Sequence, residues 1–373
     1  MLQMPTPPTG DAGAQSLSAS LHARLRAAIA DAAGCLPFDR FMAIALYEPG
    51  LGYYSRGDRQ FGVLPSSGSD FVTAPELSPL FGQALARQVA QVLDAAEADT
   101  VYEFGAGSGA LAEHLLQALG DRLRRYAIVD LSGALRRRQQ QRLARFGERV
   151  QWLSAWPAQM HGVVIGNEVL DAMPVQLLHW DGERWLERGV AATGDGFEWA
   201  DRHTDLRPPG ETVFAPGSTV EIHPQAEAFV RTLAMHLQRG AVFFIDYGFP
   251  EAEYYHPQRS GGTLMCHRAH RADTDPLVDV GEKDITAHVN FSAIALAAQD
   301  ASLDVIGYTT QAHFLINCGL LDLLQGADGR ALAAAHKLLA EHEMGELFKV
   351  IGLARGVRLD ALGFSAGDRS HTM

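Results

Sequence analysis

Residues 100–113 read TVYEFGAGSGALAE, and this stretch decides the fold. Five residues typical of a buried strand (100–104) run into a glycine-rich turn, and leucines at four-residue spacing then indicate a helix. Glycines in such a turn let backbone N–H groups approach a ligand that a side chain would obstruct. A strand, a glycine turn and a helix in this order predict one unit of a parallel α/β sheet.

The same alternation continues outward along the chain. Short apolar runs, typical of strands buried on both faces of a parallel sheet, recur with helical segments between most of them. These runs are YAIVD (126–130), VQWL (150–153), GVVIG (162–166), AVFFID (241–246), LDVIGY (303–308) and ELFKVIGLA (346–354). Between Pro174 and His223 the pattern changes to two alternating runs around Asp181 and Gly182, which predicts a hairpin insertion.

The N-terminal part of the chain is predicted to be helical. Structure is expected to begin near Leu21 with a short amphipathic helix, and Ser78 and Pro79 open a longer one. Another helix is expected between Pro224 and Gly240. The predicted division of the chain is a disordered tail (1–20), a helical N-terminal region forming part of the active-site cover (21–99), and a core (100–373) with an insertion at about 174–223.

Composition limits the classes of function. The chain has 373 residues, 47% of them hydrophobic and 20% charged, which is enough for one large or two ordinary domains. A formal net charge of -13 repels polyanions, so general nucleic-acid binding is not expected. Cys35, Cys266 and Cys318 lie far apart without a CxxC pair, so neither a disulfide framework nor a metal site is indicated. No apolar run reaches the roughly 18 residues that cross a bilayer, so membrane insertion is not expected.

The glycine turn points to a cofactor. Its glycines are Gly105, Gly107 and Gly109, and Asp130 ends the next strand, where a carboxylate can accept hydrogen bonds from both hydroxyls of a ribose. The turn also satisfies the loose dinucleotide pattern G-x-G-x-x-A. Glu103, two residues before the first glycine, favours S-adenosylmethionine, which carries a sulfonium and an ammonium and no phosphate. An ordinary glycine-rich turn and a solvated acid at the strand end are the alternatives.

A second polar cluster, GNEVLDAMPV (166–175), follows the fourth strand. Ligands of open α/β sheets sit beyond the carboxyl ends of the strands, so Asn167, Glu168 and Asp171 are placed to meet the methyl group of the cofactor and its acceptor. Two carboxylates this close can grip a planar guanidinium by paired hydrogen bonds, which makes Glu168 and Asp171 candidate catalytic residues. Helix capping by Asn167 or Asp171 is the alternative.

Two further segments give weaker signals. Asp70, Thr73 and Glu76 lie just before a helix, where capping is their commonplace role, and Thr73 and Glu76 are also candidate cofactor-binding residues. Asp284 and His288 belong to a later segment, and a lone histidine is more often packed than catalytic. His288 is nevertheless a candidate to accept the departing proton or to orient the acceptor.

Together these segments resemble the MidA-like class I methyltransferases, which are related to the mitochondrial assembly factor for respiratory complex I. The resemblance runs from residue 47 to residue 294, with a further match near 345, and is carried by LYEPGLGYYS, GSDFVTAPELSPLFG, VYEFGAGSGALA, GNEVLDAMPV, FFIDYG, GEKDITAHVNFSAI and GELFKVIGLA. It implies an α/β fold of the Rossmann-like class I methyltransferase type, with helices on both faces of the sheet, a helical N-terminal region and an inserted hairpin that forms a substrate region.

The resemblance also implies functions for particular residues. Glu103, the glycines of the turn and Asp130 are implied to contact S-adenosylmethionine, and the 167–174 segment to flank the transferred methyl group. The acceptor implied by mitochondrial members is an arginine of a complex I core subunit. This chain has Met265 and His267 where the family is expected to have arginine and tyrosine, which bears on the identity of the acceptor.

The expected reaction is displacement at the sulfonium methyl group by a nitrogen of a bound arginine. The protein is expected to lower the activation barrier mainly by orienting the reacting atoms. The alternatives are methyl transfer to a small molecule or RNA, an oxidoreductase using a dinucleotide, and a cofactor-binding assembly scaffold without turnover. The triplet Arg136 to Arg138 keeps RNA as an alternative acceptor, although such a triplet is typical of a solvated helix face.

The expected partner is a protein substrate, with a complex I subunit as first candidate, and a homodimer is left open. Asp11 and the helical pattern around Arg24 favour a cytoplasmic location, with the mitochondrial matrix as the alternative.

Overall fold

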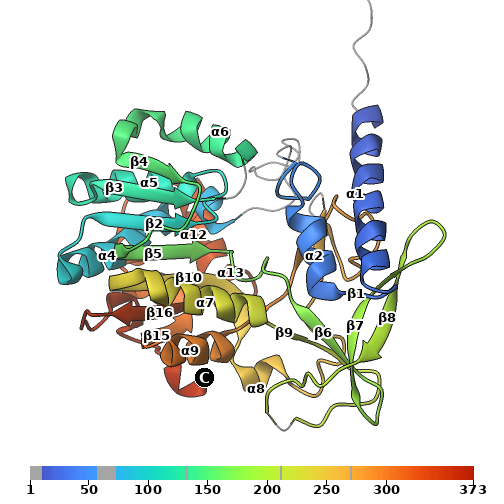
Figure 1. Ribbon diagram of the computed structural model, residues 1–373. Coiled ribbons are helices and arrows are strands. Elements are labelled where there is room, and N and C mark those ends of the chain that lie inside the picture. The colour runs from blue at the N-terminus through green and yellow to red at the C-terminus, as the bar shows by residue number, and fades with distance from the viewer. Residues whose placement is uncertain (1–10, 57–72, 131–132, 211, 269–270) are drawn as a thin grey trace, which may run out of the picture.

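The computed structural model describes residues 11–56, 73–130, 133–210, 212–268 and 271–373. It consists of a main sheet covered by helices and, beside it, a smaller lobe that contains the N-terminal helices and most of the antiparallel strands (Figure 1). The two lobes meet at the edge of the main sheet where its parallel strands end. This meeting point positions the candidate site.

The main sheet has the strand order β15-β16-β10-β5-β2-β3-β4, with β14 paired to the end of β10. Strands β4, β3, β2, β5 and β10 are parallel, and β16 runs antiparallel to both of its neighbours. The order reverses between β2 and β5, and an open α/β sheet binds ligands at such a point. The predicted α/β fold is confirmed. The bounds are β2 (Thr100–Phe104), β3 (Arg125–Val129), β4 (Val150–Leu153), β5 (Met160–Asn167), β10 (Leu237–Phe249), β14 (Val289–Asn290), β15 (Asp304–Thr310) and β16 (Phe348–Arg355).

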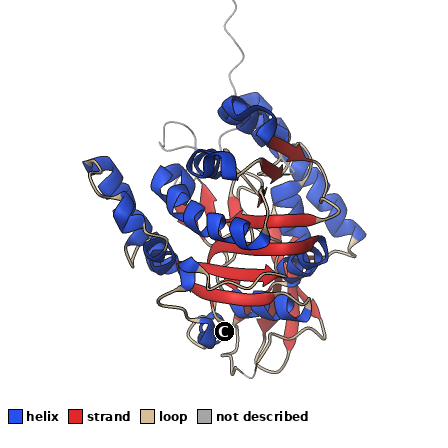
Figure 2. Ribbon diagram, turned by 90° about the vertical axis from the view of Figure 1, so that its left-hand side faces the viewer, coloured by secondary structure: helices blue, strands red, loops and turns tan. Residues whose placement is uncertain are grey.

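The strands read as continuous apolar runs because both faces of the sheet are buried. Phe243 packs in the core beneath α4 and α5, and its neighbour Phe244 packs on the opposite face beneath α7 and α9. Figure 2 shows the helices lying over the strands. The bounds are α4 (Pro79–Ala96), α5 (Ala110–Leu119), α6 (Gly133–Leu143), α7 (Pro224–His236) and α9 (Phe291–Asp300), followed by α10 (Gln311–Asn317), α11 (Leu320–Leu323), α12 (Gly329–Leu339) and α13 (Met344–Leu347).

The smaller lobe is assembled from separate stretches of the chain. Its larger sheet has the order β1-β7-β6-β9, with β8 paired to β7, and its smaller sheet has the order β12-β11-β13. Side chains of α1, α2 and both sheets share one core. The bounds are α1 (Asp11–Asp31), β1 (Leu36–Pro37), α2 (Phe38–Tyr47), β6 (Gln176–Trp180), β7 (Trp185–Ala192), β8 (Phe197–His203), β9 (Thr219–Ile222), α8 (Glu251–Tyr254), β11 (Met265–Arg268), β12 (Arg271–Asp273) and β13 (Asp284–Thr286). Helix α3 (Ala74–Leu77) packs beside α4 and α5, in the core of the main sheet.

The predicted hairpin insertion is present as β6 and β7, but it forms part of a larger sheet. β1 from the N-terminal region pairs with β7, and β9 pairs with β6. The N-terminal region and the insertion therefore fold together, because neither buries its apolar face alone. Helix α4, which the prediction grouped with the N-terminal region, packs in the core of the main sheet through residues such as Phe81 and Leu85.

Two predicted boundaries are wrong. The helix expected to begin near Leu21 begins at Asp11, because the prolines of the segment all precede Asp11 and the buried Leu21 and Leu25 anchor the helix further along. Gly240 does not end a helix, since α7 ends at His236 and Gly240 lies inside β10. A Cβ atom at position 240 would lie 1.8 Å from the carbonyl oxygen of Gly162, so this glycine allows β10 to approach β5 closely.

Within the described ranges, no helix is both long and apolar enough to cross a membrane.

We predict that Phe243→Ala lowers the free energy of unfolding by about 3–5 kcal/mol, because it leaves a cavity in the fully buried core of the main sheet. The matched control is Leu296→Ala, since Leu296 is 55% exposed on α9. The control is expected to change the free energy of unfolding by less than about 1 kcal/mol. Denaturant unfolding followed by circular dichroism measures both values, and equal values for the two variants would contradict the assigned core.

Candidate active site

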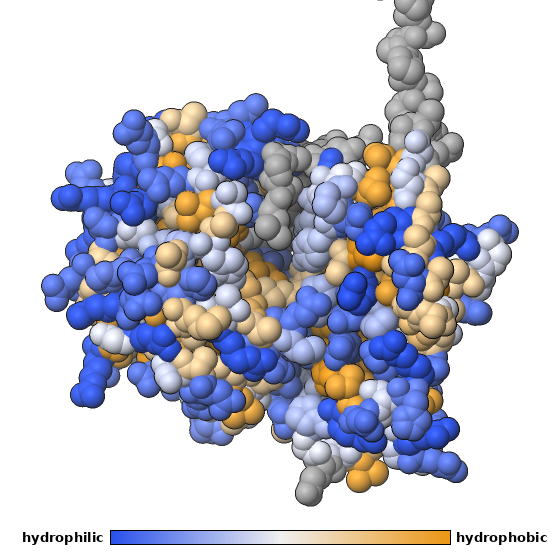
Figure 3. Space-filling view, in the orientation of Figure 1, coloured by the Kyte–Doolittle hydropathy of each residue, from blue (hydrophilic) through white to orange (hydrophobic). Residues whose placement is uncertain are grey.

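A cavity of about 1240 Å³ opens where β2, β3, β5 and β10 end, between the two lobes. The surface is visibly hollowed there (Figure 3). The main sheet contributes residues of the glycine turn and of the 167–174 segment, and the smaller lobe contributes side chains such as Tyr54 and Asp284. The volume exceeds that of a pocket for one small ligand, so a cofactor and part of an acceptor fit together.

The glycine turn has the backbone conformation that its sequence requires. Gly105, Gly107 and Gly109 have φ angles of 64°, 52° and 82°, in the left-handed region that residues with side chains adopt at a cost. A Cβ atom at position 105 would lie 2.9 Å from Cγ2 of Val169. Gly105 and Gly107 line the cavity, whereas Gly109, which lies against Gln139 and Leu143, does not line it. Contact of these glycines with the cofactor stays a prediction.

Glu103 lies on β2 next to this turn and lines the cavity, although it is only 2% exposed. Its Oε2 atom accepts a hydrogen bond of 2.8 Å from the hydroxyl of Tyr126. Burial raises the pKa of the Glu103 carboxyl to about 8, despite that hydrogen bond. A positively charged ligand group beside it would favour the ionised form, so the site suits the cationic cofactor expected from the sequence.

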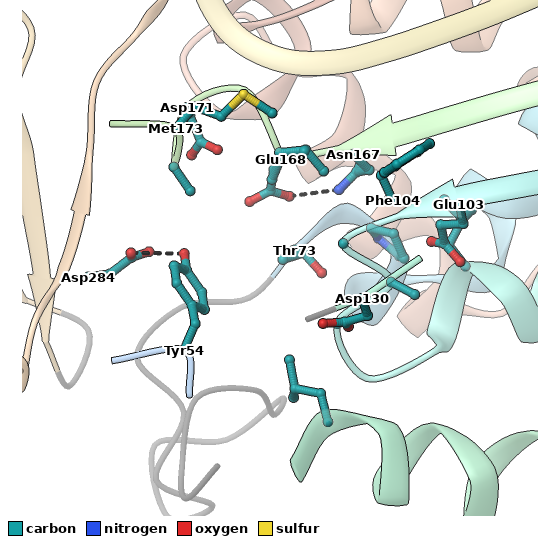
Figure 4. Close-up of a pocket in the computed structure, with 18 of the residues that line it drawn as sticks. Tyr54, Thr73, Glu103, Phe104, Asp130, Asn167, Glu168, Asp171, Met173 and Asp284 are labelled. Carbon is teal, nitrogen blue, oxygen red and sulfur yellow. Dashed lines mark hydrogen bonds between the residues drawn. The ribbon is translucent and has the colours of Figure 1, made fainter. Parts of the chain in front are cut away.

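Asp130 directly follows β3 and also lines the cavity, close to the glycine turn (Figure 4). The side-chain nitrogen of Gln139, on α6, donates to Asp130 Oδ2 over 2.8 Å and to the carbonyl oxygen of Gly107 over 2.9 Å. The sequence interpretation missed Gln139. The sequence contains a pattern that could have identified it. Gln139 falls between Leu135 and Leu143 at four-residue spacing, on the buried stripe of its helix.

Thr73 and Glu76 line the same cavity. Thr73 precedes α3, and its side chain makes no capping hydrogen bond there. Glu76 Oε1 accepts from Arg142 Nη1 over 2.9 Å and from the hydroxyl of Ser108, which ties α3 to the glycine turn. Glu76 is thus occupied by neighbours, and direct contact of Thr73 or Glu76 with the cofactor stays a prediction. Asp70 lies outside the described residues.

The 167–174 segment begins with a turn that strains the backbone. Glu168 has a φ of 53°, a conformation that costs about 1–3 kcal/mol and clusters at functional sites. Its backbone N–H donates to the carbonyl of Ile245 over 2.9 Å. Asn167 Nδ2 donates to Glu168 Oε1 over 3.1 Å (Figure 4), whereas the buried Asn167 Oδ1 has no hydrogen-bond partner within the described part of the chain. The side chain of Asn167 therefore orients Glu168 and leaves an acceptor atom for a ligand.

Asp171 faces the cavity from the same segment. Its Oδ2 atom accepts a hydrogen bond from the hydroxyl of Tyr247, and its buried Oδ1 atom has no partner among the described residues. The helix-capping alternative is thus not observed for Asp171, whose carboxyl points at a tyrosine and the cavity. The neighbouring turn is held by the fully buried Asp246, because its Oδ2 atom accepts from the backbone N–H groups of Val169, Leu170 and Asp171.

The two candidate catalytic acids have raised pKa values. Burial, and then the charge of Asp171, raises the pKa of Glu168 to about 8. Burial raises the pKa of Asp171 to about 6, while the hydrogen bond from Tyr247 opposes that rise. Two carboxyl groups that resist ionisation in each other's presence form a favourable site for one shared cation.

The wall opposite Glu168 and Asp171 belongs to the smaller lobe (Figure 4). The hydroxyl of Tyr54 donates to Asp284 Oδ1 over 2.8 Å, and Asp284 is only 2% exposed. Tyr47 bridges the lobes by donating to the carbonyl of Ala172 over 2.8 Å. Asp284 was noted in the sequence but not chosen as a site residue, because nothing local places β13 opposite β5.

His288 lies in the same cavity and is held in one orientation. Its ring stacks on Phe249 at 5.2 Å, and its Nδ1 atom is 3.4 Å from the carbonyl oxygen of Thr263. Since a carbonyl only accepts, Nδ1 carries the hydrogen and Nε2 the lone pair. Burial lowers the pKa of His288 to about 4, so the ring is neutral near pH 7 and a weak base. Met265 and His267, where the chain departs from the family pattern, also line the cavity.

We predict that Gly105→Ala weakens binding of S-adenosylhomocysteine at least tenfold, because the added methyl group both meets Val169 and disfavours the positive φ. The matched control is Gly120→Ala. Gly120 also has a positive φ, of 53°, but a Cβ atom there would meet no neighbouring side chain or backbone within 4 Å, and the residue does not line the cavity. Calorimetric titration is expected to give wild-type affinity for the control, and equal loss in both variants would refute the assignment.

Comparisons with known proteins agree with this geometry. Residues 84–309, more than half of the chain, match a family model for S-adenosyl-L-methionine-dependent methyltransferases. A crystal structure from Burkholderia thailandensis, bound to S-adenosyl-homocysteine, is 50% identical, covers 100% of both chains and superposes with a TM-score of 0.93.

More distant relatives are curated proteins. The protein arginine methyltransferase NDUFAF7 homolog of Drosophila melanogaster is 26% identical over 94% of this chain and 88% of its own length. Its counterpart from Caenorhabditis elegans is 26% identical over 77% of this chain and 74% of its own. Both are named as mitochondrial, which does not support the predicted cytoplasmic location and agrees with the mitochondrial alternative. The family match, covering the glycine turn and the acid segment, shows that this chain belongs to the S-adenosylmethionine-dependent methyltransferases and uses that cofactor.

Proposed function

We propose that this enzyme transfers a methyl group to an arginine side chain of a protein. The observation that carries the proposal is the placement of Glu168, Asp171 and Asp284 around one part of the cavity (Figure 4). These groups come from both lobes and are all buried or half-buried. A planar cation with several N–H donors is the ligand that such an arrangement of carboxyl groups binds best. The names of the curated relatives support the same acceptor class.

On the cofactor side, S-adenosylmethionine supplies an electrophilic methyl group. Glu103 is proposed to face its ammonium group, Asp130 its ribose hydroxyls, and the glycine turn its backbone. Asn167, whose Oδ1 atom is buried without a described partner, is proposed to accept a hydrogen bond near the methyl group. Thr73 lies between these residues and the acid segment in Figure 4 and stays a proposed contact.

On the acceptor side, Glu168 and Asp171 are proposed to hold the guanidinium by charge-assisted hydrogen bonds. These bonds draw positive charge toward the held N–H groups and leave the remaining nitrogen as the nucleophile. Fixing that nitrogen in line with the methyl carbon can contribute on the order of 7–11 kcal/mol. His288, neutral and with a lone pair on Nε2, is suited to orient an N–H group of the acceptor. The proton that the acceptor loses on methylation is proposed to pass to the ionised carboxylate of Glu168, whose pKa is raised to about 8.

The alternatives are weighed by the same features. Family membership decides against the dinucleotide oxidoreductase. Methyl transfer to RNA is disfavoured by the net charge of -13 and by the acids in the cavity. A complex I subunit is the first candidate for the acceptor protein, on the resemblance described above, and a homodimer remains a separate prediction. A scaffold without turnover predicts cofactor binding and no transfer.

We predict that kcat/KM for an arginine-containing acceptor rises with pH from about 6 to about 8. The pKa of Glu168 is raised to about 8, so the carboxyl is largely protonated at lower pH, and a cationic acceptor requires the ionised form. Initial rates at saturating cofactor over this pH range measure the effect. A profile that falls over the same range would show that the protonated form is the active one.

The decisive experiment for the proposed function uses tritiated S-adenosylmethionine, purified enzyme and lysate from a deletion strain. Label is expected in a protein and, after acid hydrolysis, in methylarginine. Glu168→Gln is expected to reduce transfer by about a hundredfold or more while cofactor affinity stays within about twofold, because the lost charge acts on the acceptor. Glu198→Gln, a change at an exposed position on β8, is the matched control and should leave transfer unchanged.

Each other outcome identifies an alternative. Label in RNA or in a small molecule would contradict the protein acceptor, and label in a different amino acid would contradict arginine. Cofactor binding with no transfer to any fraction would favour the scaffold. Full activity of the Glu168→Gln variant would remove Glu168 from the mechanism.

A further inference from the structure

We propose that Gln139 is a positioning residue that fixes the two halves of the cofactor site relative to each other. The two halves are the glycine turn after β2 and Asp130 after β3. Gln139 comes from α6, is 0% exposed, and donates to both halves through one nitrogen atom. A backbone hydrogen bond of 3.3 Å from the Gly105 N–H to the Val129 carbonyl oxygen joins the strand ends, and Gln139 adds a side-chain contact that reaches the Gly107 peptide and the Asp130 carboxylate themselves.

The orientation of this amide is determined by its third neighbour. The indole N–H of Trp152 lies 3.0 Å from Gln139 Oε1, and an indole nitrogen is a donor only. The oxygen of the amide must therefore face Trp152, and the nitrogen must face the opposite side. There both neighbours, the carbonyl of Gly107 and the carboxyl of Asp130, are acceptors. Both N–H groups and the carbonyl of Gln139 are thus matched, and a flipped amide would clash electrostatically on every side.

An amide suits this position better than a cation. It fixes the plane of the Asp130 carboxylate through one oxygen without neutralising the charge, so the acid keeps its strength as a hydrogen-bond acceptor for a ribose. A lysine or arginine at position 139 would instead form an ion pair with Asp130. That pair would compete with the ribose hydroxyls for the same carboxylate.

The contact with Gly107 orients the turn as well. In a trans peptide the C=O and the following N–H point in opposite directions, so holding the carbonyl of Gly107 toward α6 directs the N–H of Ser108 away from it. Gly107 has a φ of 52°, and without this hydrogen bond its peptide planes can rotate at little cost. Gln139 therefore sets a backbone direction in the turn and a carboxylate plane at the same time.

The test compares Gln139→Leu with Gln140→Leu by calorimetric titration with S-adenosylhomocysteine. Gln140 is the adjacent residue, of the same type, and is exposed. Gln139→Leu is expected to raise Kd about tenfold or more, the effect of losing hydrogen bonds to a charged group, whereas Gln140→Leu should stay within about twofold of wild type. Thermal unfolding of the ligand-free variants checks that both are folded.

A double-mutant cycle tests whether Gln139 acts through its partner. Gln139→Leu should weaken binding by a smaller factor in the Asp130→Asn background than in wild type, because its contact with Asp130 has already lost its function there while its contact with Gly107 has not. The proposal rests on the assignment of Asp130 to the cofactor. If Asp130→Asn binds as wild type, that assignment fails and the proposal with it. If only Asp130→Asn weakens binding and Gln139→Leu does not, the proposal alone fails.

A third variant gives a readout that a purely structural role would not produce. Gln139→Glu keeps the shape of the side chain but places a second carboxyl against Asp130. At about pH 9, where both carboxyl groups are ionised, repulsion should weaken cofactor binding, and at about pH 5 the introduced carboxyl, protonated because of its acidic neighbour, can donate its O–H and restore affinity toward wild type at that pH. Affinity of this variant that tracks wild type at both pH values would overturn the proposal.

Discussion

The backbone turns through the left-handed region immediately after both central strands, at Gly105 after β2 and at Glu168 after β5. These turns flank the point where the strand order reverses, so the chain leaves the sheet in two directions and a crevice opens between them. After β2 the turn is built on Gly105, Gly107 and Gly109, and the absence of side chains at these positions suits a cofactor lying on the backbone. After β5 the same conformation is imposed on a residue with a carboxyl group, and the strain is balanced by the buried Asp246, which holds the following N–H groups.

The chemistry expected of the enzyme follows from how this crevice is closed. The main sheet supplies the turn and the acids Glu168 and Asp171, and the smaller lobe supplies Asp284 with Tyr54. Burial raises the pKa of both Glu168 and Asp171, and the charge of Asp171 adds repulsion at Glu168. A cation entering between them relieves that repulsion. Burial of the acids is the physical basis of the proposed selection of a positively charged acceptor.

Most of the residues predicted from the sequence, on both the cofactor side and the acceptor side, line one cavity in the structure, whereas Asp284 and Gln139 were not predicted as site residues. TVYEF and GVVIG are recognisable because they are buried on both faces, and the glycines of the turn because residues with side chains adopt their φ angles only at a cost. Asn167, Glu168 and Asp171 could be placed because they directly follow a strand. Asp284 could not, since its position opposite Glu168 depends on the pairing of β11 with β13 and on the packing of the smaller lobe. For Gln139 the sequence shows a polar residue on the apolar stripe of a helix. That pattern indicates that the side chain is buried but does not identify its hydrogen-bond partners.

The two lobes are joined beside the acids by hydrogen bonds to main-chain carbonyl oxygens. Tyr47 binds the carbonyl of Ala172, and the backbone N–H of Ala287 binds the carbonyl of Asp171 over 3.0 Å. Both contacts use main-chain oxygens, which every amino acid provides. The acceptor atoms of this joint do not depend on which side chains stand at positions 171 and 172, so a substitution there leaves these two oxygens in place.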